Sequence, residues 1–442
     1  MAFASESGTL APPLSAVLLS AAAAVQAVDE GRSLTEALAE SEAGLRPATQ
    51  AVSFHAMRYM GWADTIANRL VPREPAPLAG ALLRVALSLL KEAPGADPLP
   101  GMPVYAPHTV VDQAVTAAAE HRRLAGFKGL INGSLRRFLR EREQFEAQLA
   151  NDPVVRWNHP QWWIKTLRQA YPQQWQSLLA AANVPAPLTL RVNRRRASRE
   201  QVLNAFSHAG LPAREAGEWG VVVLEPRPVA QLPGFAEGWW SVQDAGAQLA
   251  APLLPLVDGM RVLDACAAPG GKTAHMLEIA NLDLVALDSD ASRLERVGQN
   301  LARLGLSGAS LVAADAAKLD SWWDGKPFDA VLADVPCTAS GIVRRHPDIR
   351  WLRRAPDVAR TAALQARIAD ALWRVVAPGG HLLYVTCSIF PAEGQAQAQA
   401  FAARHADAIV LPAPGQLLPV ALDATPERQH DGFFYALFAK RR

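Results

Sequence analysis

The sequence contains few cysteines and few lysines, and its net charge is small. The three cysteines among 442 residues, Cys266, Cys337 and Cys387, are too few and too scattered for a disulfide scaffold or a zinc site, so we expect a reducing cytoplasm and no bound metal. The formal net charge is only +2, so any nucleic acid has to be met by local patches. Only seven of the 44 basic residues are lysines, which codon bias explains as readily as the suitability of arginine for phosphates.

Long hydrophobic runs are also missing. The best candidate is the segment LSAVLLSAAAAVQAV at residues 14–28, which falls short of the roughly 20 apolar residues that a membrane span needs. It follows an acidic, lysine-free start, whereas a signal peptide opens with a positively charged region. We therefore expect an alanine-rich core helix at this position and no association with a membrane.

The hydrophobic pattern changes twice along the chain. Up to about residue 150, apolar residues recur every three or four positions, as in LAGALLRVALSLL, and Ser33 with Glu36 forms a capping box. The next stretch contains a strand that runs into a basic turn, LTLRVNRRR, a second strand, GVVVLE, and a helix capped by Ser198. These patterns predict a multidomain protein that begins with an all-α domain over residues 9–150, followed by a small α+β module over residues 151–238.

From about residue 239 onward, strands and helices alternate, which is typical of a doubly wound parallel sheet. The sequence therefore predicts a third domain, a Rossmann-like α/β domain over residues 239–442. The strands that we expect in it are RVLDAC, LVALDSD, ASLVAADA, FDAVLADVP, GGHLLYVTCS and FFYALFAK.

A glycine-containing loop, AAPGGKT, follows the first of these strands and ends like a triphosphate-binding loop. The first glycine of that motif would fall at Cys266, and the dinucleotide motif G-x-G-x-x-G is absent, so both ligands fit poorly. Asp288, Asp315 and Asp334 are expected where the next three strands end, at the crevice where such sheets bind ligands and where an acidic side chain can hold a ribose. A nucleoside without a phosphate chain remains, namely S-adenosylmethionine, and Lys272 is a candidate partner for its carboxylate. The loop residues assigned to this cofactor are Cys266, Ala267, Ala268, Pro269, Gly270, Gly271 and Lys272.

Two cysteines are expected beside the same crevice. Cys337 ends the fourth strand in ADVPC, and Cys387 ends the fifth in YVTCS. A thiolate next to a methyl donor suits methylation at carbon: addition to C6 of a cytosine makes C5 nucleophilic enough to take the methyl group. The residues alone leave open which cysteine plays which part.

Long blocks of the chain resemble the RNA cytosine-5 methyltransferases. DACAAPGGKT, DVPCTASGIVRRHPDIRW and YVTCSIFPAEG are similar to the signature blocks of that family. The whole chain is most similar to the branch that acts on small-subunit (16S) ribosomal RNA, because INGSLRRFLRERE resembles the end of the NusB-like helical domain of that branch. The resemblance implies a methyltransferase that uses S-adenosylmethionine, with Cys387 as the nucleophile and Cys337 assisting product release. It also places Asp334 near the target base.

The chain departs from the family pattern at Val335, where alanine is more usual, and at Gly394, where asparagine is frequent. Two other functions stay open at this point. One is a cytosine-5 methyltransferase for transfer RNA. The resemblance of the N-terminal helical domain to that of the ribosomal RNA branch argues against it. The other is a non-enzymatic RNA-binding assembly factor, which loss of a cysteine or of the aspartate set would favour, but all of these residues are present.

The segment GIVRRHPDIRWLRR, next to the expected base pocket, is rich in arginine. Arginines grip phosphates and aromatic rings stack on bases, so this segment is a candidate RNA contact, although Trp351 by itself is better explained as a core residue. A basic cluster near residues 191–199 is a second candidate. The protein is expected to be a monomer with small-subunit ribosomal RNA as its partner. The candidate RNA-binding residues are Arg344, Arg345, Arg350, Arg194 and Arg195.

Overall fold

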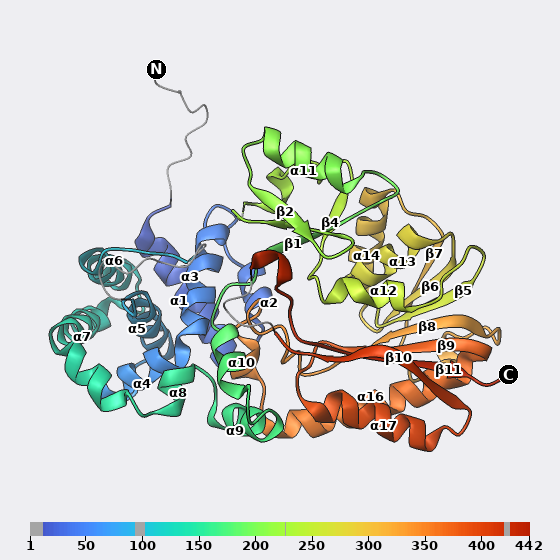
Figure 1. Cartoon of the computed structure of the whole chain (residues 1–442). Helices are drawn as coiled ribbons and strands as arrows, with labels where there is room; N and C mark the ends of the chain where they lie inside the picture. Colours follow the sequence, from blue (N-terminus) through green and yellow to red (C-terminus); the bar gives the residue numbers. More distant parts are fainter. Residues whose placement is uncertain (1–11, 93–101, 226, 420–424) are drawn as a thin grey trace. The chain divides into compact units, whose positions relative to one another are not determined.

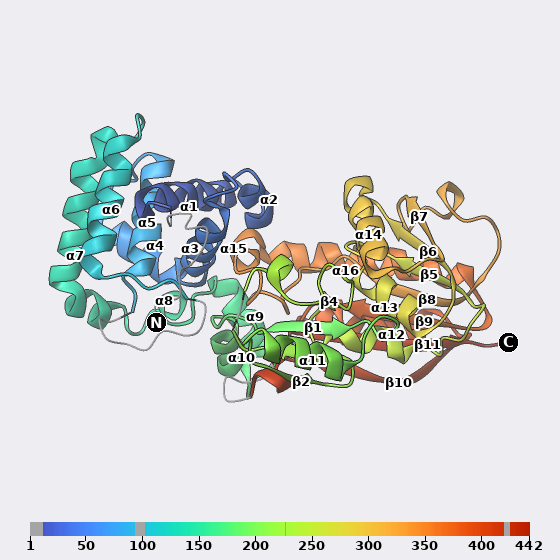
Figure 2. The ribbon, with the colours of Figure 1, turned by 90° about the horizontal axis from the view of Figure 1, so that it is seen from above.

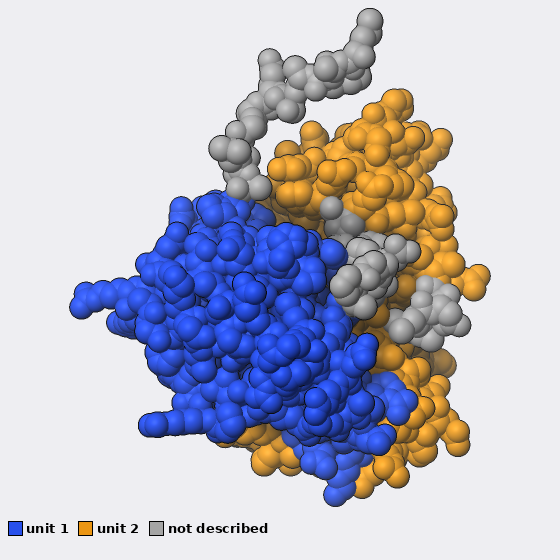
Figure 3. All heavy atoms as spheres, turned by 90° about the vertical axis from the view of Figure 1, so that its left-hand side faces the viewer, with its two compact units in different colours: residues 1–165, 346–352 blue, residues 166–345, 353–442 orange. Residues whose placement is uncertain are grey.

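The computed structural model describes residues 12–92, 102–225, 227–419 and 425–442. The chain forms two compact units, Met1–Lys165 with His346–Leu352 and Thr166–Arg345 with Arg353–Arg442 (Figure 3). The first unit is helical, and the second holds two sheets. The small module and the large sheet both belong to the second unit. Within the described ranges, no helix is long and apolar enough to cross a membrane.

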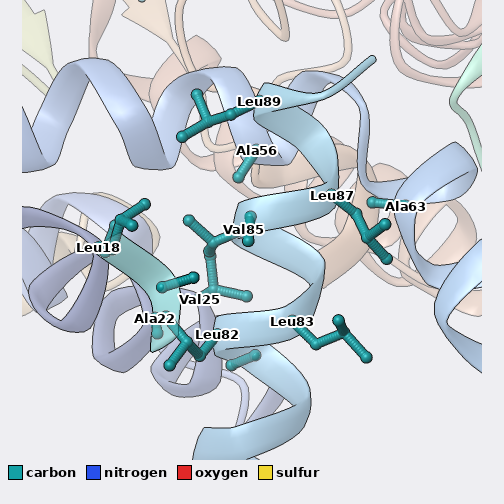
Figure 4. Close-up of a cluster of buried hydrophobic side chains, with 14 of the residues drawn as sticks. Leu18, Ala22, Val25, Ala56, Ala63, Leu82, Leu83, Val85, Leu87 and Leu89 are labelled. Carbon is teal, nitrogen blue, oxygen red and sulfur yellow. The ribbon is translucent and has the colours of Figure 1, made fainter. Parts of the chain in front are cut away.

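The helical unit is built around α1 (Leu14–Asp29) and α5 (Pro77–Leu89). Leu18 and Val25 of α1 and Leu82 of α5 are fully buried in one core, and Figure 4 shows their side chains meeting. The expected alanine-rich core helix is therefore confirmed, because small side chains allow the neighbouring helices to approach closely. The helices that complete this part of the unit are α2 (Leu34–Ala39), α3 (Arg46–Arg58), α4 (Met60–Leu70), α6 (Pro107–Glu120), α7 (Lys128–Leu149) and α8 (Pro153–Trp157), with α6 and α7 side by side in Figure 2.

A short segment from far along the chain, His346–Leu352, belongs to this helical unit. The Asp348 carboxylate accepts a hydrogen bond from the backbone nitrogen of Leu34 at the start of α2, at 2.9 Å. The indole of Trp351, on α15 (Ile349–Leu352), donates to the carbonyl oxygen of Met57, at 2.8 Å. Trp351 is thus a packing residue, as expected.

The small sheet of the second unit has the strand order β2-β3-β1-β4, and all of its pairings are antiparallel. The helix α11 (Arg199–His208) begins at Ser198, whose side chain forms the expected capping box with Gln201. Val202 and Phe206 of this helix are fully buried in the core that covers the sheet. The strands are β1 (Leu188–Val192), β2 (Ala213–Ala216), β3 (Gly220–Val223) and β4 (Trp240–Val242), of which the sequence predicted β1 and β3.

The large sheet has the strand order β10-β11-β9-β8-β5-β6-β7. The five strands from β7 to β9 are parallel, whereas β10 and β11 are antiparallel, so the sheet is mixed rather than wholly parallel as the sequence analysis predicted. The Rossmann-like class is confirmed. The strands are β5 (Arg261–Ala265), β6 (Asp283–Asp288), β7 (Ala309–Ala313), β8 (Phe328–Asp334), β9 (Val376–Thr386), β10 (Ala408–Leu417) and β11 (Phe433–Lys440).

Helices cover both faces of this sheet (Figure 1). One face packs against α12 (Ala250–Leu253), α13 (Gly271–Ile279) and α14 (Ala291–Leu304). The other packs against α16 (Ala355–Val375) and α17 (Gln395–Arg404). The strand order reverses at β5, with β6 on one side and β8 on the other, so a ligand crevice is expected beyond the carboxyl end of β5.

Truncation of Leu82 to alanine tests the core of the helical unit. The side chain is fully buried, so we expect Leu82→Ala to lower the free energy of unfolding of that unit by about 2–5 kcal/mol. Urea denaturation followed by far-ultraviolet circular dichroism measures the change. Leu19→Ala, a partly buried position in α1, is the matched control and is expected to lose much less; equal losses would contradict the assignment of the core.

Candidate active site

The loop between β5 and α13 turns sharply at the carboxyl edge of the large sheet. Cys266 and Gly270 both have left-handed backbone conformations, with φ of 65° and 92°. A side chain at position 270 would be strained, and its Cβ would lie 2.9 Å from a methyl group of Val297 on α14. Gly270 therefore allows the loop to close against α14, and α13 starts with its N-terminus at this edge.

Asp264, near the end of β5, is buried beneath this loop. One of its carboxylate oxygens accepts a hydrogen bond from the Thr273 hydroxyl at 2.6 Å, while the other has no partner among the described residues. Burial raises the pKa of Asp264 to about 7, although the Thr273 hydrogen bond acts in the opposite direction.

The three aspartates that the sequence analysis placed at strand ends lie where β6, β7 and β8 end. Asp288 ends β6, and its two oxygens accept hydrogen bonds from the backbone nitrogens of Ala268 and Asp290, each at 3.0 Å. Asp334 ends β8, whereas Asp315 lies two residues beyond the end of β7. Burial raises the pKa of Cys266, and the negative charges of these three aspartates and of Asp264 raise it further. All four carboxylates therefore surround the loop.

Lys272, in the first turn of α13, forms an ion pair with Asp334 at 2.5 Å. Burial by itself would lower the pKa of Lys272, but the charge and the hydrogen bond of Asp334, together with the charges of Cys387 and Asp264, raise that pKa above its usual value. The proposed partner of Lys272 was a cofactor carboxylate. In this structure its ammonium group is bound to the protein's own Asp334 and is close enough to Cys387 for their charges to interact.

The two cysteines singled out in the sequence analysis are in direct contact. Their sulfur atoms lie 3.4 Å apart, and both side chains are half-buried. Cys387 directly follows β9, and its carbonyl oxygen accepts a hydrogen bond from the backbone nitrogen of Gly341, in the loop that carries Cys337. The contact with Cys387, burial and the nearby Glu393 carboxylate raise the pKa of Cys337 well above its usual value. Cys337 is thus a thiol at neutral pH.

Glu393 was not selected from the sequence as a functional residue. It is fully buried in the short helix η5 (Pro391–Glu393), and its carboxylate accepts hydrogen bonds from residues that directly follow each cysteine. These are Thr338, through its nitrogen at 2.9 Å and its hydroxyl at 2.5 Å, and Ser388, through its hydroxyl at 2.6 Å. Its closeness in sequence to Cys387 was the one available signal.

The position after this glutamate is Gly394, where the family pattern often has asparagine. A Cβ at Gly394 would lie 2.9 Å from the ring of Phe434 on β11. Glycine here therefore lets η5 pack against the sheet without displacing that ring.

The arginines after Cys337 are held by the protein itself. Arg344 is buried and donates to Asp431 and Gln429. Arg345 bridges Asp244, at 2.8 Å, and Asp431, at 2.5 Å. These ion pairs tie the loop to Asp431, which precedes β11, and to Asp244, so both guanidinium groups already have partners within the protein.

Arg350 is fully buried in the helical unit and donates to the carbonyl oxygen of Asn158 at 3.1 Å. Arg344, Arg345 and Arg350 are therefore all bonded within the protein in this structure, and their contact with RNA stays a prediction.

The basic cluster of the small module contains both buried and exposed arginines. Arg191 is fully buried and forms a bidentate ion pair with Glu278, at 2.9 and 2.7 Å. Arg194 and Arg195 are exposed. The guanidinium of Arg194 lies over the ring of Trp219, 3.7 Å from its centroid. Arg195 donates to the side chain of Asn281 at 2.8 Å and keeps an exposed charge beside it.

Known proteins match the chain along almost its whole length. The profile described as 16S rRNA methyltransferase RsmB/F matches residues 251–439, and that of the RsmF/B-like ferredoxin-like domain matches residues 159–230. A ribosomal RNA small subunit methyltransferase B of Vibrio vulnificus is 41% identical over 430 residues, which are 94% of this chain and 97% of the relative. The protein of the same name from Pseudomonas syringae pv. tomato is 46% identical over 346 residues, 75% and 77% of the two chains.

Solved structures share the fold. The crystal structure of PH0851 superposes with a TM-score of 0.77 at 24% identity and covers 98% of this chain and 100% of its own. NSun6 from Pyrococcus horikoshii superposes with a TM-score of 0.57 at 18% identity and covers 64% of this chain and 98% of its own.

The class of protein that the fold and site define is the Rossmann-like methyltransferase that uses S-adenosylmethionine. Within that class, the chain belongs to the 16S rRNA methyltransferase RsmB/F family, as its resemblance to the RNA cytosine-5 methyltransferases had indicated.

Replacement of Asp264 by asparagine tests the buried carboxyl. The pKa of this group is raised on folding, so its contribution to stability is present at low pH and is lost as the pH rises through about 7. Asparagine does not ionise and can still accept from Thr273. We therefore expect Asp264→Asn to gain about 2–3 kcal/mol relative to the wild type between pH 5 and pH 8.5. Denaturant unfolding at the two pH values measures this gain, and a constant difference between variant and wild type would contradict it.

Proposed function

We propose that this chain methylates C5 of a cytosine in 16S ribosomal RNA and that the reaction passes through a covalent bond between Cys387 and C6 of the base. The observation that carries the proposal is the pair of thiols, 3.4 Å apart, beside the aspartate-lined loop at the carboxyl edge of the sheet. Membership of the RsmB/F family supports the class of substrate. We place the reaction in the cytoplasm and propose that the protein acts as a monomer.

The chemistry of the loop suits S-adenosylmethionine better than a phosphorylated nucleotide. Four carboxylates surround the loop, and its lysine is already paired with Asp334, so a triphosphate would be repelled. A cationic nucleoside has no such penalty. When bound, S-adenosylmethionine supplies an electrophilic methyl group. The residues that would hold it are Cys266, Ala267, Ala268, Pro269, Gly270, Gly271 and Lys272, together with Asp288, Asp315 and Asp334.

Each part of this set has a distinct task. The Asp288 carboxylate is fixed by two backbone nitrogens and keeps lone pairs that can accept from ribose hydroxyls. Gly270 brings the backbone and the N-terminus of α13 close to the ligand. Asp334 holds Lys272, and the pair faces the cysteines, where the target base would bind.

The surroundings of the two cysteines favour Cys387 as the nucleophile. Glu393 helps to raise the pKa of Cys337 and so favours its thiol form, whereas the Lys272 ammonium is close enough to Cys387 for their charges to interact. The Cys387 thiolate adds to C6, and C5 then takes the methyl group. A base or solvent water takes the C5 proton, the electron pair of the C5–H bond restores the double bond to C6, and the bond between sulfur and C6 breaks with its electron pair on the sulfur, which returns Cys387 as a thiolate. Cys337, as the protonated neighbour, assists this release.

We propose that the exposed residues Arg194 and Arg195 contact the RNA. A planar guanidinium over Trp219 presents both charge and a stacking surface, which suits single-stranded RNA. The target cytosine has to leave its stack to reach Cys387.

Alanine substitution separates the roles of the two cysteines. We expect Cys387→Ala to transfer no labelled methyl group to deproteinised 16S ribosomal RNA and to form no covalent adduct. Cys337→Ala is expected to accumulate an RNA adduct that survives a denaturing gel, because release is blocked. Thermal melting of both variants controls for folding. Full turnover by Cys387→Ala would refute the assignment.

Substitution of both exposed arginines tests the RNA contact. We expect the Arg194→Ser, Arg195→Ser double variant to bind 16S RNA more weakly, and the slope of its salt dependence to fall by about 0.7 for each phosphate that is no longer neutralised. Filter binding at several salt concentrations measures both effects. Arg360→Ser, at an exposed position of α16, is the control. An unchanged slope in the double variant would exclude these residues as phosphate ligands.

A further inference from the structure

The carboxylate of Glu393 has an unusual environment for a buried charge. It is fully buried, yet in the described part of the chain it has no ion-pair partner; its hydrogen bonds all come from neutral donors. A buried carboxylate without a cation is costly unless several hydrogen bonds stabilise it. We therefore expect Glu393 to have a specific task at this position.

The donors come from the two cysteine loops and from α16. Thr338, which follows Cys337, gives its backbone nitrogen and its hydroxyl, and Ser388, which follows Cys387, gives its hydroxyl. Thr361 and Gln365 of α16 complete the set, at 2.5 and 3.2 Å. One carboxylate thus binds the residue after each cysteine and anchors both loops to the same helix.

Further contacts hold the two loops against each other. The hydroxyls of Ser340 and Ser388 lie 2.9 Å apart, and the backbone nitrogen of Gly341 donates to the carbonyl oxygen of Cys387 at 2.8 Å. The Tyr384 hydroxyl donates to the carbonyl oxygen of Glu393 at 2.9 Å, which fixes the glutamate itself to β9. The contact between the sulfurs is the consequence of this network.

The charges on the two sides of the sulfur pair are opposite. The carboxylate of Glu393 is close enough to Cys337 for its charge to act on that thiol, whereas the ammonium of Lys272 is close enough to Cys387 for their charges to interact. Two thiols in contact share their first ionisation, and the surrounding charges decide which sulfur keeps the proton.

We propose that Glu393 is a positioning residue: it holds the two cysteine loops together and keeps the proton on Cys337. The meaning of this arrangement for catalysis rests on the function proposed above, since a thiolate at Cys387 is the nucleophile and a thiol at Cys337 is the partner for release. The distribution of the proton itself can be measured without RNA or turnover.

The test is the pH dependence of alkylation of each cysteine in the full-length protein. Iodoacetamide reacts with thiolates, and mass spectrometry of the digested protein gives separate rates for Cys266, Cys337 and Cys387. In the wild type we expect Cys387 to react at a lower pH than Cys337. In Glu393→Gln, the negative charge beside Cys337 is gone, so we expect its alkylation at pH 8 to become about tenfold faster, with the rate at Cys266 unchanged.

Two further variants separate charge from packing. Glu278→Gln removes another buried carboxylate, one that pairs with Arg191, and is expected to leave the preference for Cys387 over Cys337 intact. Glu393→Asp keeps the charge on a shorter side chain. The alkylation rate of Cys337 is therefore expected to rise less in Glu393→Asp than in Glu393→Gln. If Glu393→Gln does not fold, as judged by thermal melting, Glu393→Asp decides the question by the presence or absence of that rise.

Three results would overturn the proposal. The first is a Cys337 rate in folded Glu393→Gln within about twofold of the wild type. The second is a parallel increase at all three cysteines, which would indicate general loosening. The third is that Glu278→Gln also loses the preference for alkylation of Cys387 over Cys337. None of these results bears on whether Cys387 attacks RNA, so failure here leaves the proposed function to its own test.

Discussion

The parallel pairing of β5, β6, β8 and β9 is the constraint on which the site depends. Parallel strands end at the same edge, and here that edge receives the loop with Cys266, the carboxylate of Asp288 and the loops of Cys337 and Cys387. Residues that are far apart in the sequence therefore meet because each of them follows one of these strands. The helical unit and the small module build separate cores around other residues.

Charge within this edge is distributed unevenly, and that distribution gives each group its task. The carboxylates around the Cys266 loop disfavour phosphate and suit a cationic nucleoside. Lys272 forms an ion pair with Asp334 and is close enough to Cys387 for their charges to interact. On the opposite side, Glu393 keeps Cys337 protonated while its hydrogen bonds hold both loops in place. The same buried carboxylate thus combines a mechanical and an electrostatic role.

Much of the fold could be predicted from the sequence because the signals were local. The capping boxes at Ser33 and Ser198, the apolar period of the helices and the strands that precede Asp288 and Asp334 were all evident in short windows. The strand β10 was missed because two prolines and a glycine interrupt it, and a register shift between Leu411 and Gly415 accommodates them.

Burial and distant partners are what a single sequence does not reveal. Arg344, Arg345 and Arg350 form part of a basic run, but their partners, Asp431, Asp244 and Asn158, lie far away in the chain. The role of Glu393 could not be predicted for the same reason. A glutamate in a short loop is usually exposed, and only the fold brings Thr338 and Ser388 to its carboxylate.

The most direct measurement is the identity of the residue that binds RNA covalently. 16S RNA that contains 5-fluorocytosine cannot lose a C5 proton, so it traps the adduct on the wild-type protein in the presence of S-adenosylmethionine. Digestion and mass spectrometry then locate the attached nucleotide. The account predicts attachment at the sulfur of Cys387. Attachment at Cys337, or methyl transfer to normal RNA with no trapped adduct on the fluorinated RNA, would contradict it.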